Sequence, residues 1–508
     1  MWTSSNKRTW RAKPCPPSPR LKPQPPTNIK EASMPLQRTL LALACATVLA
    51  GCASLSPDGG ASGIQTQAAP SLKAYGVDNT PIATASTEQT EAAVKTMLTS
   101  PLTMDTAVRI ALLSSPQIAH SMAQLRITEA DRVQAATLPN PHFSFMRAVE
   151  GDKVMLERAL GLNIMSIIAL PWRSQWQGQQ LELAKLQAAQ EVIRLAADTR
   201  KAWISAVAAQ QTAQYAAQAK LAAEAAGELA RRLARVGNWS KLNQAKEQAI
   251  LADAATMQAK AENMAFSERE KLIRLMGLWG EQTQFKLPDR LPDLPAEVRD
   301  SQGIESQALS QRLDVRAAAM QADYVAKSLG YVRASGFLNA LDLKLIRETT
   351  TDQTTGDKEK LRGWELELPI PIFDWGGAAN ARTQATYMQS VAQVRKTAIT
   401  ARSEAREAWH SYRTAHDIAK HYRDEIVPLR KYINDETLLR YNGMLIGVFE
   451  LLSDTRTNIL TVSASIDALR DFWLIETDLQ TALTGTSPGG LAGLQAGAAS
   501  GGTEAKGH

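Results

Sequence analysis

Residues 181–236 read LELAKLQAAQEVIRLAADTRKAWISAVAAQQTAQYAAQAKLAAEAAGELARRLARV. From Gln179 to Val236 there is no proline and a single glycine, Gly227, and strong helix formers dominate. At about 1.5 Å per residue, a helix over this stretch is roughly 85–90 Å long. Because such a rod buries little of its surface inside a compact domain, the sequence predicts long partner helices packed closely along its alanines.

The plan of the chain repeats after about 200 residues. ALLSSPQIAHSMAQ, from Ala111, parallels ALSQRLDVRAAAMQ, from Ala308. A helix, two β-like runs, a long helix, a glycine-containing break and a return helix follow in each half. The breaks, LARVGNWSKLNQ and LRYNGMLIGVFE, place Gly237 opposite Gly443. In the second half Pro428 predicts a kink or a boundary in the long helix.

Short stretches with alternating polarity predict the strands. FLNALDLKL (337–345) and GWELELPIPIFDW (363–375) alternate clearly, whereas HFSFM (142–146) and ALGLNIMSI (159–167) are less regular. The polar side chains of one face are Asp342, Lys344, Glu365 and Glu367. Runs of about 9–11 residues suit tilted membrane strands with apolar residues outside and polar residues inside. An ordinary soluble antiparallel sheet explains the alternation equally well.

The apolar run LLALACATVLAGCASL, from Leu40, is too short to span a bilayer and suits a secretory signal. Leu49-Ala50-Gly51-Cys52 resembles a bacterial lipobox. The resemblance implies a signal peptide over 34–51, cleavage before Cys52 and acylation of that cysteine. Ala53, in place of the aspartate that retains lipoproteins at the inner membrane, favours an outer-membrane anchor. A chance cysteine after an apolar run is the alternative.

The positive net charge of the chain comes from its first residues. The full chain has 57 Lys and Arg against 51 Asp and Glu. Seven of the basic residues and one acidic residue lie in 1–33, a Pro-rich stretch typical of an untranslated or disordered leader. From Cys52 onward the net charge is about −1, which removes the global argument for nucleic-acid binding. Cys52 is also the only cysteine of the predicted mature chain, so no internal disulfide forms.

Composition divides the rest of the mature chain. Residues 52–100 are rich in Ser, Ala, Thr, Gly and Pro and predict a lipid-anchored extended segment. The repeats are expected over 101–295 and 296–485, and the Gly/Ala-rich end, 486–508, is typical of a disordered tail.

Over residues 101–485 the chain resembles the TolC-like outer-membrane efflux proteins. The stretches that carry the resemblance are AVRIALLSSPQI, ATLPNPHFSF, PIFDWGGAANART and RYNGMLIGVFELLSD, and LPNP is nearest the heavy-metal and drug-efflux lipoproteins. The resemblance implies a homotrimer with a shared 12-stranded β-barrel, four strands from each protomer, continued by a hollow periplasmic α-helical barrel. It also implies a passive exit duct that works with a periplasmic adaptor protein and an inner-membrane pump.

The same resemblance assigns roles to particular residues. It makes the two breaks periplasmic tips that dock the adaptor, and it places acidic residues near the constriction, where Glu450 and Asp454 follow the second tip. The tip residues are Arg235, Val236, Gly237, Asn238 and Trp239 in the first break and Tyr441, Asn442, Gly443 and Met444 in the second. Internal packing of the tips and helix-surface solvation of the two carboxylates are the competing interpretations. Asp342, Lys344, Glu365 and Glu367 are expected to face the barrel lumen.

No enzyme is expected from the sequence, because it has no phosphate-binding loop and no clustered Ser, His and Asp. His410 and His421 share a helix face but lie about 16 Å apart along its axis, too far for one metal ion. We therefore expect no cofactor and no metal. The main alternative to a duct is a periplasmic coiled-coil adaptor or scaffold lipoprotein that does not span the outer membrane. Two strand pairs in duplicate favour the duct.

Overall fold

The computed structural model describes residues 55–77, 87–335, 341–368, 370, 372–373 and 375–489. These residues belong to one compact unit, Ala53–His508. Cys52, the predicted leader 1–33 and signal 34–51, and residues 490–508 of the predicted tail lie outside the described residues. Within the described ranges, no helix is long and apolar enough to cross a membrane.

The described chain is mainly helical with four antiparallel strands, which confirms the predicted fold class of one protomer. The first half contains α2 (Ala61–Ala74), α3 (Thr87–Met97), α4 (Met104–Ser114), α5 (Pro116–Ala135), β1 (His142–Glu150), β2 (Lys153–Asn163), α6 (Ile164–Ile168), α7 (Leu170–Arg235), α8 (Lys241–Met276) and the 3-10 helix η1 (Gly280–Thr283). The second half contains α9 (Ile304–Gln311), α10 (Leu313–Ser335), β3 (Asp342–Asp352), β4 (Lys358–Glu367), α11 (Gly377–His421), the π-helical turn η2 (Tyr422–Ile426), α12 (Val427–Asn442) and α13 (Val448–Thr484). The order of elements therefore repeats as predicted.

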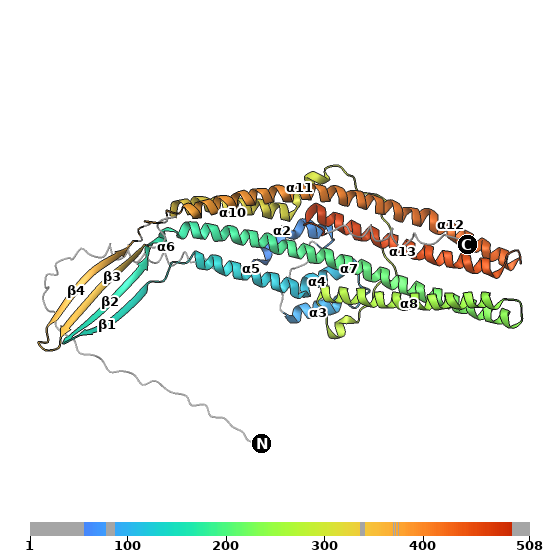
Figure 1. Ribbon diagram of the computed structural model, residues 1–508, viewed down its shortest axis with the longest axis horizontal. Coiled ribbons are helices and arrows are strands. Elements are labelled where there is room, and N and C mark those ends of the chain that lie inside the picture. Colours follow the sequence, from blue (N-terminus) through green and yellow to red (C-terminus); the bar gives the residue numbers. More distant parts are fainter. Residues whose placement is uncertain are drawn as a thin grey trace, which may run out of the picture. The chain divides into compact units, whose positions relative to one another are not determined.

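Helix α7 organises the packing. It has 66 residues and is about 100 Å long. It begins at Leu170, before the predicted start at Gln179, because Pro171 occupies its first turn, where a missing N–H costs nothing. It forms a hairpin with α8 and also contacts α2, α4, α5, α10 and α13. Figure 1 shows the strands at one end of the long helices and the two hairpin turns at the other.

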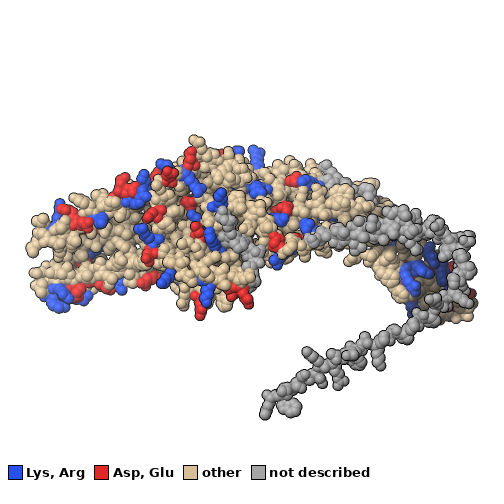
Figure 2. Space-filling view, turned by 180° about the vertical axis from the view of Figure 1, so that it is seen from behind, with Lys and Arg blue, Asp and Glu red and all other residues tan. Residues whose placement is uncertain are grey.

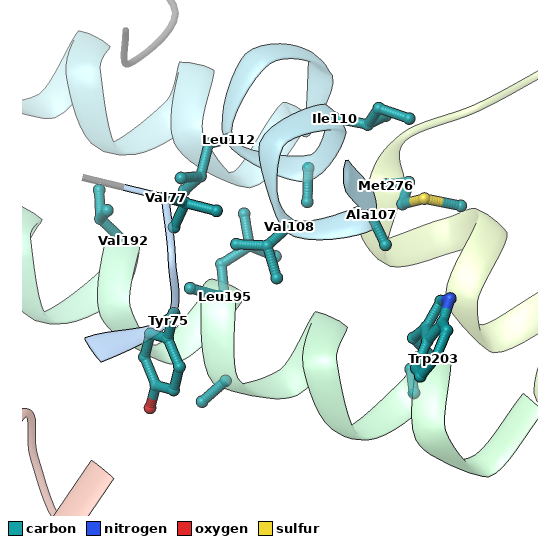
Figure 3. Packing of buried hydrophobic residues seen from close by; sticks show 14 of the residues in the cluster. Tyr75, Val77, Ala107, Val108, Ile110, Leu112, Val192, Leu195, Trp203 and Met276 are labelled. Atoms are coloured by element: carbon teal, nitrogen blue, oxygen red, sulfur yellow. The ribbon is translucent and has the colours of Figure 1, made fainter. Parts of the chain in front are cut away.

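Two groups of buried side chains hold the helices together. The larger one joins α4, α7 and the end of α8 and includes Val108, Leu195, Trp203 and Met276 (Figure 3). Trp203 Nε1 donates a 2.8 Å hydrogen bond to the carbonyl oxygen of Leu102, which satisfies its one polar atom. The smaller group joins α9, α11 and α13.

The start of the described chain differs from the extended segment expected over 52–100. It forms α2 and α3 instead. Ile64, Ala68 and Leu72 are fully buried, and Tyr75 Oη lies 2.8 Å from Oγ1 of Thr481 on α13. The apolar residues recur every three or four positions, which makes one helical stripe that packs on α7 and α13.

The sheet has the order β1-β2-β3-β4, and each neighbouring pair is antiparallel and continuous in register. The strands lie nearer their hairpin turns than expected. The runs 337–345 and 363–375 predict strands that the structure places at Asp342–Asp352 and Lys358–Glu367, and residues 336–340 are not described. Beyond Ile346 and before Gly363 both strands are polar except at Leu361, so alternation gives no indication of them although they pair with each other.

Pro428 lies at the boundary that the sequence predicts. Helix α11 ends at His421, five π-helical residues follow, and α12 begins at Val427 with Pro428 in its first turn. Proline has no backbone N–H to donate, so one hydrogen bond of the helix is missing. The π-helical turn accommodates this loss, and the helical run continues through it.

Candidate functional site

The four residues expected to line a lumen come together on one face of the sheet. Asp342 is the register partner of Glu367, and Lys344 is the register partner of Glu365. Lys344 Nζ lies 3.1 Å from Oε1 of Glu365 and 3.3 Å from Oε2 of Glu367. Asn163 Nδ2 donates a 3.0 Å hydrogen bond to Oδ1 of Asp342. The alternation predicted from the sequence therefore holds at these positions.

Charge is separated between the two faces of the sheet. Because side chains alternate along strands without a bulge, the register assigns every strand residue to one face. The first, here called the acidic face, carries Glu150, Glu157, Asp342, Glu348, Asp352, Glu359, Glu365 and Glu367, with Lys153 and Lys344 as its basic residues. The second, here called the basic-apolar face, carries Arg147, Arg158, Arg347, Lys358, Lys360 and Arg362 and, within β1–β4, no acidic residue.

The basic-apolar face also carries most of the large apolar side chains of the strands. Phe143, Leu160, Leu345 and Trp364 form one row across the sheet. All four are between 49% and 70% exposed in the single chain. Among the described residues, strands β1 and β4 each pair with one neighbour only, so both edges of the sheet are open there. A sheet with an exposed apolar face and two open edges needs further copies or partners to complete it.

The first predicted tip is a tight reversal between α7 and α8. Gly237 has φ +80°, and Asn238 N–H donates a 3.0 Å hydrogen bond to the Leu233 carbonyl, which closes the end of α7. Ser240 then caps α8 through Asn243 N–H. Arg235, Val236 and Asn238 are exposed, whereas Trp239 is half-buried.

The second tip, between α12 and α13, uses methionine where the first uses glycine. Met444 has φ +57°, and Leu445 N–H closes the helix end on the Arg440 carbonyl at 2.9 Å. Gly443 has φ −76°, so the structural counterpart of Gly237 is Met444. Aligning the two halves of the sequence had placed Gly443 opposite Gly237, and this is wrong by one residue. Met444 is 93% exposed, and Asn442 is exposed beside the half-buried Tyr441. Glycine-based alignment misses this reversal because a non-glycine residue holds the left-handed position.

The two hairpins are joined close to the tips by a pair that the sequence does not reveal. Glu247 on α8 is 2% exposed, and Nη2 of Arg456 on α13 lies 2.8 and 2.7 Å from its two carboxylate oxygens. The pair borders a cavity of about 450 Å³ between α7, α8 and α13. A contact between residues this far apart along the chain leaves no pattern in a single sequence.

Glu450 and Asp454 lie one turn apart near the start of α13. Glu450 is exposed, whereas Asp454 is half-buried and its Oδ2 has no hydrogen-bond partner among the described residues. The two candidates for an acidic ring therefore have different environments, although they share a helix face.

Two buried charged residues, Arg312 and Asp478, were not predicted from the sequence. Arg312 is fully buried at the α9–α10 junction and donates to Asp314 at 3.0 and 2.6 Å and to Glu404 at 2.7 Å. Asp478 on α13 is 8% exposed and faces Lys201. Burial raises the pKa of Asp478 above its ordinary value, and Lys201 opposes that shift only in part.

The histidines that the structure describes do not form a common site. His416 packs against Phe472 with ring centroids 5.8 Å apart, and its Nε2 lies 3.2 Å from the Pro295 carbonyl oxygen. His421 lies beside Glu425 instead. In the part of the chain that is described, no group of three or more His, Cys, Asp and Glu side chains is placed to hold a metal ion.

Comparison with known proteins gives a result at the level of the fold. No family model matches the sequence, and no curated protein matches it significantly. A solved membrane protein from Pseudomonas aeruginosa is 18% identical, with a TM-score of 0.63 over 75% of this chain and 93% of its own. The Campylobacter jejuni CmeC outer membrane channel is 15% identical, with a TM-score of 0.62 over 78% of this chain and 88% of its own. The chain has the fold of TolC-like outer-membrane channels.

A third structure extends this result. The open state of the Neisseria gonorrhoeae MtrE outer membrane channel is 16% identical and has a TM-score of 0.60 over 75% of this chain and 89% of its own. These matches cover most of each channel, so the TolC-like fold includes both the strands and the long helices. The resemblance predicted from the sequence is confirmed for the fold.

Proposed function

We propose that this chain forms the outer-membrane exit duct of a tripartite efflux or secretion system. In this proposal three copies assemble, each gives four strands to a 12-stranded barrel in the outer membrane, and the helices continue the duct into the periplasm. Cys52 carries the lipid anchor. The duct performs no chemistry and conducts cargo passively from a periplasmic adaptor and an inner-membrane pump.

The two-faced open sheet is the observation that carries the proposal. A membrane strand cannot leave backbone groups unpaired, so four strands with open edges at β1 and β4 need closure by other copies. Closure with the acidic face inward gives a polar lumen, and the row Phe143, Leu160, Leu345 and Trp364 then contacts lipid. The nearly complete burial of Ala159, 3% exposed on the acidic face, agrees with that face being concave.

The tips supply the adaptor-docking surface in this proposal. Val236 is 68% exposed and Met444 is 93% exposed, and both lie at hairpin reversals at the same end of the helices (Figure 1). Exposed apolar side chains at a chain end are typical of docking surfaces. Arg235, Gly237, Asn238 and Trp239 complete the first tip, and Tyr441, Asn442 and Gly443 complete the second.

The entrance near the second tip supplies selectivity. Glu450 or Asp454, repeated three times around a trimer axis, forms an anionic ring that favours cations. Exposure supports Glu450 as the residue that faces the passage.

Cysteine cross-linking between strands tests the assembly. A cysteine in place of Ala148 on β1 and another in place of Gly363 on β4 lie on opposite edges of one sheet, about 14 Å or more apart across three strand spacings. A bis-maleimide with a reach well below that distance therefore joins them only between copies. We expect covalent trimers from membranes that express this pair. The control pair, cysteines in place of the register partners Ala159 and Ile346, cross-links within one chain and stays monomeric on a denaturing gel.

The mass of the detergent-extracted protein, together with electron-microscope images of it, decides between the duct and a scaffold lipoprotein. A hollow trimer with lipid mass on Cys52 supports the duct. A monomer released without detergent, together with no β1–β4 cross-link, contradicts it and supports the scaffold.

A further inference from the structure

Three arginines form a row across the basic-apolar face. Arg158 is the register partner of Arg347, and Arg347 is the register partner of Arg362. Neighbouring strands lie about 4.8 Å apart, and like charges directly opposite each other are destabilising. Arg147 and Lys360 lie in the next row toward the hairpin turns, so positive charge continues in that direction.

Nothing in the described part of the chain neutralises this row. All three arginines are exposed, and none forms an ion pair or a side-chain hydrogen bond with another described residue. On the acidic face, by contrast, Lys344 is held between Glu365 and Glu367. Figure 2 shows the strand end from a side on which Lys and Arg gather with few acidic side chains. An anion from outside the described chain is therefore needed to neutralise the three arginines.

The position of the row indicates which anion. Trp364 and Leu366 on β4 and Leu368 just after it follow Arg362 toward the helices, and all are at least 48% exposed. On the other side Lys360 and Lys358 lead to the hairpin turn. Leu368 lies six positions beyond Arg362, about 20 Å along an extended chain. On β3 and β4 the arginines thus lie at the end of the apolar surface that is farther from the helices, at the level where lipid head groups meet the hydrocarbon. On β1 and β2 apolar residues continue past the row, at Leu156, Val149 and Val154.

We propose that Arg158, Arg347 and Arg362 bind the phosphate groups of lipids in the outer leaflet, the one farther from the helices. The inference rests on the proposed function, because it requires the apolar part of this face to contact lipid. The guanidinium group binds phosphate through two parallel hydrogen bonds, and its weaker hydration than that of lysine suits a boundary partly shielded from water. In a closed trimer the three rows form one ring around the barrel.

The experiment measures binding of lipopolysaccharide to the assembled, detergent-extracted protein by native mass spectrometry. The comparison ligand is the same lipid after its phosphates have been removed. We expect the dephosphorylated lipid to bind the unmodified protein at least tenfold more weakly. We expect the same loss for phosphorylated lipid when Arg158, Arg347 and Arg362 are all replaced by Gln.

A matched variant removes the same charge elsewhere. Lys260, Lys396 and Lys431 are exposed on α8, α11 and α12, and their replacement by Gln should change lipid binding less than twofold. Equal losses in both triple variants, or undiminished binding of lipopolysaccharide to the arginine variant, overturn the proposal. Displacement of the lipid by an equal concentration of inorganic phosphate also overturns it, since the row then binds soluble anions.

Two readouts separate this inference from the proposed function. If the unmodified protein forms trimeric, conducting pores but binds both lipids equally, the phosphate site is wrong and the duct stands. If the unmodified protein forms no trimer and no pore, both the proposed duct and the phosphate site are wrong. If the arginine variant does not assemble, the phosphorylated and dephosphorylated lipids on the unmodified protein still decide the question.

Discussion

Nη2 of Arg456 on α13 lies within 2.8 Å of both carboxylate oxygens of Glu247 on α8. Glu247 is 2% exposed, and Arg456 keeps 38% of its side chain in solvent. Both lie within the first three turns of helices that start at the tips. The pair therefore ties one hairpin to the other near the end where the duct is expected to close.

Replacing Arg456 by Ala leaves Glu247 buried and unpaired. Breaking a buried pair costs about 3–5 kcal/mol, and the solvent access of Arg456 reduces this to an expected 1–3 kcal/mol. We also expect a higher single-channel conductance, because the hairpins separate more easily. Thermal unfolding and planar-bilayer recordings measure the two effects. Arg440→Ala, which removes an exposed pair with Glu436 inside α12, is the control and should change neither by much. Unchanged stability and conductance in the Arg456 variant would exclude a tie between the hairpins.

Met444→Gly should stabilise the protein and weaken adaptor docking. The left-handed conformation costs an L-residue about 1–2 kcal/mol, and glycine removes this cost. Glycine also raises the entropy of the unfolded chain, which lowers the stability of the folded protein by about 0.5–1 kcal/mol. A net gain between zero and about 1.5 kcal/mol is expected in thermal unfolding. Gly237→Ala places the reverse change at φ +80°, in open space, and should lose about 1 kcal/mol. If Met444→Gly binds the adaptor as tightly as the unmodified protein does, Met444 is not part of the docking surface.

The sequence predicted those parts of the fold that leave a periodic pattern. The long helix around Trp203 shows as a proline-free stretch, and the strand segments near Lys344 and Glu365 show as alternation. The polar ends of the strands carry no alternation, so only their pairing identifies them. The helix over Ala61–Ala74 was hidden by its Ser- and Ala-rich composition, although its apolar residues already had helical spacing.

Partners that are distant along the chain could not be predicted in this way. Glu247 meets Arg456 across 209 residues, and Arg312 meets Glu404 across 92. Such contacts depend on how the two halves pack, which one sequence does not encode as a local pattern. Met444 lies in the chain reversal where the sequence places the second break, but its left-handed backbone was not predicted, because glycine is the residue expected there.

Arg312→Leu tests the buried charge at the α9–α10 junction. Asp314 and Glu404 both lose their cation, and neither carboxylate has more than 22% of its side chain in solvent. We expect a loss of about 3–5 kcal/mol in the free energy of unfolding. Arg316→Ala removes an exposed contact with Gln67 and should stay within about 0.5 kcal/mol. Equal effects of the two changes in chemical denaturation would mean that the junction tolerates unpaired carboxylates.

Asp478 makes stability depend on pH in a direction opposite to that of most carboxylates. Burial raises its pKa in the folded state above the unfolded value, so its contribution is fully present below the unfolded pKa and is lost as the pH rises through the folded pKa. Lys201 faces it and moderates the loss. Asp478→Asn should therefore gain stability relative to the unmodified protein as the pH rises above 4. Unfolding curves at pH 4, 5, 6 and 7 measure this, and a constant difference between the two proteins would contradict it.

Glu450 and Asp454 are separated by their environments, and neutralising each in turn shows which one selects ions. Exposed Glu450 is expected to face the passage, so Glu450→Gln should lower the cation-to-anion permeability ratio about twofold to threefold in a salt gradient. Asp454 has an oxygen without a partner among the described residues, and an unsatisfied buried group costs about 1–3 kcal/mol. Asp454→Asn should therefore keep the permeability ratio and leave stability equal or higher. The opposite assignment, with selectivity lost only in Asp454→Asn, would place the constriction one helical turn farther from the tip and make Glu450 a solvated surface residue.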